Sequence, residues 1–162
     1  MDIAARPGWL RAVVLSGGPI LAAGMLGNFA TLPNIAPWYD GLVKPPLNPP
    51  NWVFGPVWSL LYLLMGVAFY RILRSPDSSR RRRAIWLFAA QLAFNTAWSF
   101  AFFAAHSPLL GLVVILPLEA LILATIDAFR RIDGVAAACL VPYALWVAFA
   151  TYLNAAIFAL NG

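Results

Sequence analysis

Five continuous apolar runs, each long enough to cross a bilayer as a helix, dominate this chain of 162 residues. The runs cover residues 10–32, 53–73, 84–105, 109–130 and 135–160. A bilayer core of about 30 Å is spanned by about 20 helical residues, which each run supplies. Polar and apolar residues do not alternate with period two within the runs, which argues against a β-barrel. The sequence therefore predicts an all-α integral membrane protein in which residues 1–162 form a single domain, a bundle of five transmembrane helices.

The composition of the chain supports a membrane location. Hydrophobic residues make up 62% of it and charged residues only 10%, which is too few to cover a water-soluble surface. The first run has Arg6 and Arg11 near its start, as a signal peptide would. It is nevertheless longer than the usual apolar segment of a signal peptide, and no small-x-small cleavage site follows it. We expect this run to be retained as the first transmembrane helix.

The basic residues predict how the bundle is oriented. If the N-terminus lies inside, ten of the eleven basic residues fall on the inner side and only Lys44 lies outside. The inner set is Arg6, Arg11, Arg71, Arg74, Arg80, Arg81, Arg82, Arg83, Arg130 and Arg131. The positive-inside rule thus places the N-terminus inside and the C-terminus outside. The four consecutive arginines resemble a nucleic-acid patch, but an anchor against anionic headgroups explains them without a nucleic-acid partner.

A proline-rich segment connects the first two helices on the outer side, in the predicted loop 33–52. Its prolines are Pro45, Pro46, Pro49 and Pro50. They exclude a helix there, because proline lacks the backbone N–H and fixes φ, and the residue before each proline favours extended geometry. The segment carries Trp52 at its end and runs directly into the second apolar run. We expect a stiff, aromatic-tipped hairpin that forms the mouth of a ligand pocket.

The third predicted helix has two contrasting faces. Residues three, four and seven apart share a face, and this spacing brings together Gln91, Asn95, Trp98 and Phe102. The opposite face is a stripe of small residues, Ala89, Ala93, Ala97, Ala101 and Ala105. Such a stripe lets a helix approach closely, either within the bundle or, as we expect, in a homodimer. The two amides need partners in the membrane, which other helices or a ligand would provide.

Aromatic and small side chains from three helices and the outer loop are predicted to converge on one cavity. They are Tyr62 of the second helix, Trp98 of the third, Trp146, Ala150 and Leu153 of the fifth, and Trp38, Tyr39 and Trp52 of the loop. A flat, largely apolar ligand would stack well between such rings. The alternative is an aromatic belt at the membrane interface, which explains Trp38 better than Trp98 or Trp146, because the last two lie well inside their helices.

Glu119, in the fourth run, is the only acidic residue predicted at membrane depth. An ionised carboxylate there would be costly, so the side chain should be protonated, paired or turned toward a cavity. A structural hydrogen bond and a role in binding a ligand or a proton are both consistent with the sequence. The substitution Glu119→Gln distinguishes them, because unchanged folding and unchanged ligand affinity would remove this residue from the site.

Residue patterns of the common catalytic sites are missing from the sequence. Cys139 is the only cysteine and His106 the only histidine, which leaves no disulfide and no Cys/His metal cluster within one chain. There is also no phosphate-binding glycine loop and no G-x-S-x-G elbow. The sequence therefore predicts no catalytic residue, no metal site and no required cofactor.

Three ordered motifs resemble those of a known family. They are Trp38-Tyr-Asp-Gly-Leu-x-Lys-Pro continued by Asn48-Pro-Pro-x-Trp-Val-Phe-Gly-Pro-Val-Trp58, then Gln91-Leu-Ala-Phe-Asn-x-x-Trp98, then Pro142-Tyr-x-x-Trp-x-x-Phe-Ala-Thr-x-Leu-Asn154. Along essentially its whole length the chain resembles the translocator proteins, also called tryptophan-rich sensory proteins (TspO) or peripheral benzodiazepine receptors. The resemblance implies a five-helix bundle, commonly dimeric, that binds porphyrins such as protoporphyrin IX and drug-like isoquinoline carboxamides or benzodiazepines. Animal members are also linked to cholesterol.

Carried over position by position, the resemblance implies a ligand pocket. Its residues are Trp38, Tyr39, Trp52, Tyr62, Asn95, Trp98, Trp146, Ala150 and Leu153. From the residues alone we add Gln91 and Phe102, which share the face of Asn95. We also add Lys44, the one basic residue on the outer side, as a partner for a porphyrin propionate.

Three departures from the family pattern affect these expectations. Leu47 occupies a loop position that is often aromatic in the family, which would weaken stacking by the lid. Ser99 and Phe100 follow Trp98 where relatives often have proline, so this part of the third helix is expected to be straighter. No basic residue follows Tyr152, as the sterol-recognition pattern requires, and sterol binding through that motif is unsupported.

The resemblance implies a membrane receptor, sensor or carrier for porphyrins that regulates tetrapyrrole level or a stress response. Two alternatives stay open: light- and oxygen-dependent porphyrin degradation, with Trp52 and Trp146 as electron-rich groups, and transport of small hydrophobic metabolites. Transport is less favoured, because the sequence shows no inverted repeat. The arginine bias predicts a bacterial cell membrane, whereas some bacterial relatives and the mitochondrial ones lie in outer membranes. The expected partners are a porphyrin or other hydrophobic ligand, the lipid bilayer and a second copy of the chain.

Overall fold

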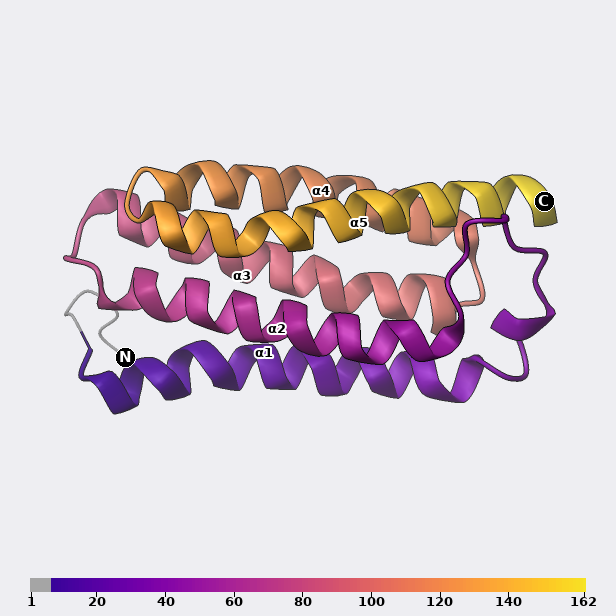
Figure 1. The fold of residues 1–162 in the computed structure, drawn as a ribbon, viewed down its shortest axis with the longest axis horizontal. Helices are drawn as coiled ribbons and strands as arrows, with labels where there is room; N and C mark the ends of the chain where they lie inside the picture. Colours follow the sequence, from indigo (N-terminus) through magenta and orange to yellow (C-terminus); the bar gives the residue numbers. More distant parts are fainter. Residues whose placement is uncertain (1–6) are drawn as a thin grey trace.

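The computed structural model describes residues 7–162, which form five long helices (Figure 1). They are α1 (Trp9–Thr31), α2 (Asn51–Arg74), α3 (Ser79–Ser99), α4 (Pro108–Arg130) and α5 (Gly134–Asn161). Two short 3₁₀ turns, η1 (Leu32–Asn34) and η2 (Tyr39–Gly41), lie between α1 and α2, and a π-helical segment, η3 (Phe100–Ala104), continues α3. No strand occurs in the described residues, and all five long helices have the length and hydropathy to cross a membrane. The predicted all-α, multi-pass membrane fold is confirmed.

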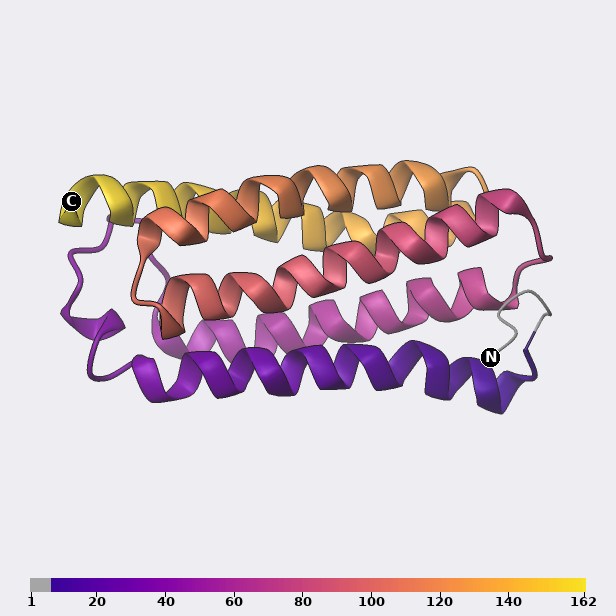
Figure 2. The same cartoon turned by 180° about the vertical axis from the view of Figure 1, so that it is seen from behind.

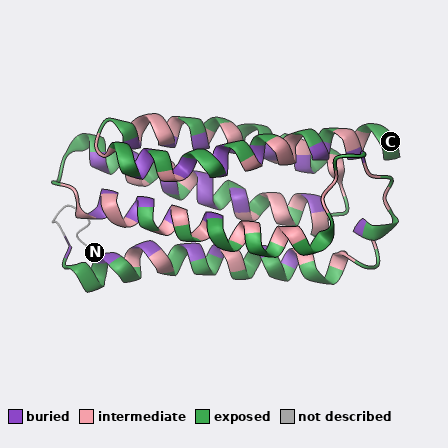
Figure 3. Ribbon diagram, viewed as in Figure 1, coloured by how far each residue is buried: buried purple, intermediate pink, exposed green. Residues whose placement is uncertain are grey.

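The five helices lie side by side in an up-and-down bundle (Figures 1 and 2). The start of α1 and the α2–α3 and α4–α5 connections share one end of the bundle, and the α1–α2 loop, the α3–α4 connection and the C-terminus share the other. Helix α4 packs mainly against α5 and α3, while α1 packs against α2 and α3. Large apolar side chains such as Leu21 (69% exposed) and Trp86 (74% exposed) lie on the outer surface (Figure 3). This distribution suits a surface that faces lipid.

Most basic residues of the described chain lie at the end of the bundle where α1 begins. There Arg71 is 2.9 Å from the carboxylate of Asp133, and Arg130 is 2.9 Å from that of Asp127. The clustering of arginines at one end agrees with the charge asymmetry that underlies the predicted orientation. Arg6, which was counted in the same group, lies outside the described residues.

Helix α3 begins earlier than the sequence analysis predicted. Its predicted start was Ala84, whereas the observed first residue is Ser79. The reason is an N-cap, because the Ser78 hydroxyl oxygen accepts a hydrogen bond from the backbone N–H of Arg81 at 3.1 Å. The arginine run therefore forms the first turn of α3 and is not a loop.

The far end of α3 widens into a π turn. The backbone N–H of Ala105 donates to the carbonyl oxygen of Phe100 at 2.8 Å, and that of Ser107 donates to Phe102 at 3.2 Å. This i→i+5 spacing is that of a π-helix, which occurs mostly as single turns near functional sites. The replacement of proline by Ser99 and Phe100 predicts a straighter helix here. The widened turn instead begins at Phe100 and contains Phe102, whose side chain is buried.

Candidate ligand-binding site

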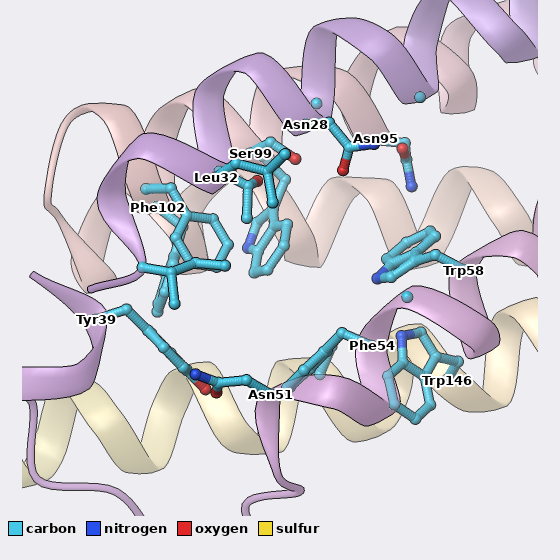
Figure 4. Close-up of a pocket in the computed structure, with 18 of the residues that line it drawn as sticks. Asn28, Leu32, Tyr39, Asn51, Phe54, Trp58, Asn95, Ser99, Phe102 and Trp146 are labelled. Carbon is cyan, nitrogen blue, oxygen red and sulfur yellow. The ribbon is translucent and has the colours of Figure 1, made fainter.

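A cavity of about 440 Å³ lies in the half of the bundle that ends at the α1–α2 loop (Figure 4). Its walls come from α1, α2, α3 with η3, and α5, while η1 and η2 lie at its outer end and α4 contributes no lining residue. Figure 4 shows Tyr39, Trp58, Phe102 and Trp146 arranged around one open space. Ligand sites of small molecules typically measure about 300–1,000 Å³ and are mostly apolar. The cavity therefore has the size and character of such a site.

Nine of the residues singled out from the sequence line this cavity. They are Tyr39, Trp52, Tyr62, Asn95, Trp98, Phe102, Trp146, Ala150 and Leu153. They come from the η2 turn and from α2, α3, η3 and α5, which the fold brings together although they are far apart in the sequence. Trp52 lies at the mouth, with 75% of its surface exposed. The geometry thus gathers most of the candidate residues around one space.

Three candidate residues lie outside the cavity lining. Trp38 stacks on His106, with ring centroids 4.9 Å apart, and contacts the edge of Phe102 at 5.4 Å, so it supports the lining from behind. The Lys44 ammonium group donates to two backbone carbonyl oxygens of its own loop, at 3.2 and 3.3 Å, and lies 4.8 Å from the centre of the Tyr39 ring. Gln91 is one turn deeper than Asn95, and its side chain is only 1% exposed.

Two side-chain amides fix the polar groups of the cavity wall. Asn95 accepts a hydrogen bond from the Tyr62 hydroxyl at 3.2 Å and donates one to the Tyr143 hydroxyl at 2.9 Å. Asn154 accepts a hydrogen bond from the indole N–H of Trp98 at 3.1 Å and donates to the backbone carbonyl oxygen of Pro108 at 2.7 Å. Because these amides are paired within the protein, they orient the rings that face the cavity.

The roof of the cavity is tied to the bundle by side-chain hydrogen bonds. The Tyr39 hydroxyl donates to Asn48 at 3.0 Å, which links the η2 turn to the proline segment. The Asn161 amide pairs with both the N–H and the C=O of Val43, each at 2.9 Å, and so joins the loop to the end of α5. Burial, aided by the charge of Asp40, raises the pKa of Tyr39 although its bond to Asn48 opposes the shift. The phenol therefore stays neutral and able to donate.

The α1 wall of the cavity was missed in the sequence analysis. It consists of Gly24, Gly27, Asn28 and Thr31, which recur at helical spacing. A methyl group at Gly24 would lie 3.2 Å from the Tyr62 ring, so this glycine lets α2 approach closely. The spacing was a usable signal, but small and polar residues on one face do not indicate a cavity without knowledge of the partner helix.

Two further residues with special chemistry lie away from the cavity lining. Glu119 is in the middle of α4, and one of its carboxyl oxygens is buried without a hydrogen-bond partner. Cys139 is a half-buried free thiol in α5. Within residues 7–162 no three His, Cys, Asp or Glu side chains come together in a way that could hold a metal ion.

Comparison with known proteins adds to this geometry. The model of the TspO/MBR family matches residues 16–160. The tryptophan-rich protein TspO of Chlorobaculum tepidum is 44% identical over 146 residues, which are 89% of this chain and 92% of that protein. The tryptophan-rich sensory protein of Cereibacter sphaeroides is 40% identical over 124 residues (76% and 77%), and the human translocator protein is 35% identical over 150 residues (91% and 88%). The chain belongs to the TspO/MBR family.

Proposed function

We propose that this membrane protein binds porphyrins of the protoporphyrin IX type, and other flat, largely apolar molecules, in the aromatic cavity. It acts as a receptor, sensor or carrier that regulates tetrapyrrole level or a stress response. The observation that carries the proposal is the cavity of about 440 Å³ with tryptophans from α2, α3 and α5 in its walls. The names of the relatives, a tryptophan-rich sensory protein and a translocator protein, support a sensing or carrying role.

Aromatic packing explains why a flat ligand fits this space. Trp98 stacks on Phe102 with centroids 5.3 Å apart, and the edge of Phe54 meets Trp146 at 5.9 Å. Aromatic pairs in such arrangements contribute roughly 0.5–1.5 kcal/mol each beyond the burial of their surface. A macrocycle that lies in the cavity against these rings gains further contacts of this kind.

Polar groups that remain available in the wall give a ligand its orientation. Within the described residues, no side-chain hydrogen bond involves Asn28 of α1 or Ser99 of α3, although both line the cavity and both are labelled in Figure 4. In contrast, the amide of Asn95 and the indole N–H of Trp98 already have partners. The carbonyl or carboxyl groups of a ligand are therefore expected to contact Asn28 and Ser99 first.

The charge asymmetry supports a proposed orientation of the cavity in the membrane. The cavity lies in the half of the bundle opposite the arginines, so the positive-inside rule directs its mouth to the outer side. We infer insertion into a bacterial cell membrane with the N-terminus inside and the C-terminus outside. A porphyrin would then enter from the outer leaflet or from the space beyond it.

Titration with protoporphyrin IX in the dark, followed by tryptophan fluorescence, tests the proposal. The purified, detergent-solubilised wild type is compared with Ala150→Phe, which places a ring inside the cavity, and with Ala148→Phe, which places the same ring on the exposed face of α5. We expect saturable quenching by the wild type. Ala150→Phe should raise the dissociation constant about tenfold or more, equivalent to about 1.4 kcal/mol, while Ala148→Phe changes it less than about twofold.

Two results would contradict the proposal. Quenching that never saturates would mean that the porphyrin partitions into the micelle. Saturable quenching that is identical in all three proteins would place the porphyrin at another site. Circular dichroism and gel filtration of each variant show whether it is folded, so that a loss of affinity is not confused with misfolding.

A further inference from the structure

Glu119 is a half-buried acid in the middle of α4 that ligand binding in the cavity leaves unused. It lies between Ile115 and Ile122 of the buried face of α4, and its Oε2 atom has no hydrogen-bond partner. In the described chain it is the only acidic residue more than one turn inside a membrane-spanning helix. Carboxyl groups at such positions are costly to ionise and commonly bind a proton or an ion.

A chain of hydrogen bonds leads from the cavity toward this carboxyl group. Tyr62, which lines the cavity, donates to Asn95 Oδ1 at 3.2 Å, and Asn95 Nδ2 donates to the Tyr143 hydroxyl oxygen at 2.9 Å. Tyr143 is buried behind the cavity wall on α5, the helix that packs most closely against α4. Counted from the α4–α5 connection, Tyr143 lies about 14 Å along α5 and Glu119 about 17 Å along α4, so the two residues are at one level of the bundle. Each donor in this chain points away from the cavity. The Tyr143 hydroxyl oxygen accepts the last of these hydrogen bonds, so its own proton is the one that can turn toward α4.

Gln91 adds a second polar group at the same depth. Both its Nε2 and its Oε1 are buried without a hydrogen-bond partner. Measured from the short connection between the two antiparallel helices, Gln91 lies about 20 Å along α3 and Glu119 about 17 Å along α4, so both are at one level of the bundle. Unpartnered polar atoms are rare inside proteins and usually mark a buried water or a functional group.

We propose that Glu119 takes up a proton when a ligand fills the cavity, and that Tyr62, Asn95 and Tyr143 connect the two sites. The inference rests on the proposed function, because it requires a ligand in the cavity. The only covalent change is formation of the O–H bond of the Glu119 carboxyl group. The proton comes from the solvent and returns to it when the ligand leaves.

The sign of the coupling between ligand binding and protonation of Glu119 follows from the direction of the hydrogen bonds that run from Tyr62 to Tyr143. In the proposed coupling, water in the free cavity would donate to the Tyr62 oxygen and strengthen the donors that follow it, and these polar surroundings would favour the Glu119 carboxylate. An apolar ligand displaces this water and supplies no donor in its place. The loss of nearby water also disfavours the charged form. Ligand binding and proton uptake thus support each other, and affinity rises as the pH falls.

Few other ionisable groups face Glu119. Of the two long helices packed against α4, α3 carries the amides of Gln91 and Asn95 near this level, and α5 carries the thiol of Cys139 and the phenol of Tyr143. The nearest charged residue on α4 is Asp127, about 12 Å further along the helix, where it pairs with arginines. A proton exchanged on ligand binding is therefore assigned to Glu119.

The test measures the affinity for protoporphyrin IX dimethyl ester, whose esterified propionates do not titrate, from roughly pH 5 to 9, where buried glutamates ionise. We expect the dissociation constant of the wild type to rise with pH, by up to about tenfold per pH unit while one proton is linked to binding. A pH-indicator dye in weak buffer should report uptake of at most about one proton per bound ligand. Glu119→Gln should bind with the affinity that the wild type has at low pH, at every pH tested.

Two further variants keep the test informative if Glu119→Gln folds poorly. Tyr143→Phe removes the last hydroxyl of the hydrogen-bonded connection, so the ratio of the dissociation constants at high and low pH should shrink, whatever the affinity at low pH becomes. Asp127→Asn removes a carboxyl group at the arginine end and should keep the pH dependence of the wild type. Saturable binding that is independent of pH in the wild type overturns the inference alone, whereas absence of saturable binding at every pH overturns the proposed function with it.

Discussion

Replacing Gly111 with alanine should loosen the contact between α4 and the back of the cavity wall. A methyl group at this buried position would lie 2.5 Å from Asn154 Oδ1 and 2.9 Å from the Phe102 ring, well inside ordinary contact distance. Asn154 cannot move freely, because it holds the Trp98 indole at 3.1 Å and the Pro108 carbonyl oxygen at 2.7 Å. Either α4 moves away from α5, or Asn154 releases Trp98.

The structure sets the size of the effect. Overpacking of a close contact costs about 1–3 kcal/mol. Hydrogen bonds between membrane helices contribute about 0.6 kcal/mol each on average, so releasing both bonds of Asn154 adds about 1 kcal/mol. Alanine is favoured over glycine within a helix by up to about 1 kcal/mol, which offsets part of the loss. The free energy of unfolding should therefore fall by about 1–3 kcal/mol.

Gly66→Ala in α2 is the matched control. The nearest atom to its added methyl group belongs to Ile20 and is 3.9 Å away, an ordinary contact, so only the helix-propensity gain of up to about 1 kcal/mol is expected. Equilibrium unfolding of both variants in mixtures of SDS and mild detergent measures the difference. If Gly111→Ala is as stable as Gly66→Ala, the close approach of α4 to Asn154 does not limit stability and the reasoning fails.

Three other outcomes follow from the structure. Asp133 caps α5 and pairs with Arg71. Partial burial tends to raise the pKa of its carboxyl group, but hydrogen bonds from a backbone N–H of α5 and from the Arg71 guanidinium lower this pKa overall. Asp133→Ala should therefore lower the melting temperature at neutral pH. The difference in melting temperature from the wild type should shrink as the pH falls through the lowered pKa that Asp133 has in the folded protein. A difference that stays constant with pH would contradict this. Asn161→Ala removes both bonds to Val43, so amide hydrogen exchange in the proline loop should accelerate while that of α2 is unchanged, and equal protection in both proteins would argue against the tie. We propose that two copies associate through the exposed small-residue face of α3, so the wild type should be a dimer and Ala93→Trp a monomer in gel filtration with light scattering. A monomeric wild type, or a variant that remains dimeric, would contradict this.

The sequence predicts the helices well because the information is local. A run of apolar residues long enough to cross a bilayer has few alternatives to a helix, and proline or a serine cap decides where it ends or begins. The same holds for the faces of single helices. Tyr62, Trp98 and Trp146 could be placed on the inner faces of their helices by spacing alone.

The contacts of individual side chains could not be predicted, since they depend on partners far away in the sequence. Trp38 stacks on His106, and the Lys44 ammonium group donates hydrogen bonds to carbonyl oxygens of its own loop. Gln91 shares a helical face with Asn95, but one turn of depth separates a residue that lines the cavity from one that lies beyond it. Periodicity gives the direction in which a side chain points, whereas depth along the bundle is a property of the assembled helices.

Helix α4 contributes no side chain to the cavity lining, but it packs against residues that hold the lining in place. Gly111 lets Asn154 approach, and Asn154 in turn holds the indole of Trp98. Glu119 lies at the level of Tyr143 on the neighbouring helix, and Tyr143 accepts the hydrogen bond from an amide of the cavity wall. Both connections pass through a residue of α5, so a substitution in α4 can change ligand affinity without touching the ligand. Side chains that do not touch the ligand thus orient the wall of the cavity. A substitution at Gly111 should therefore lose its effect on ligand affinity once Asn154 has been replaced, and a substitution at Glu119 should lose its effect once Tyr143 has been replaced.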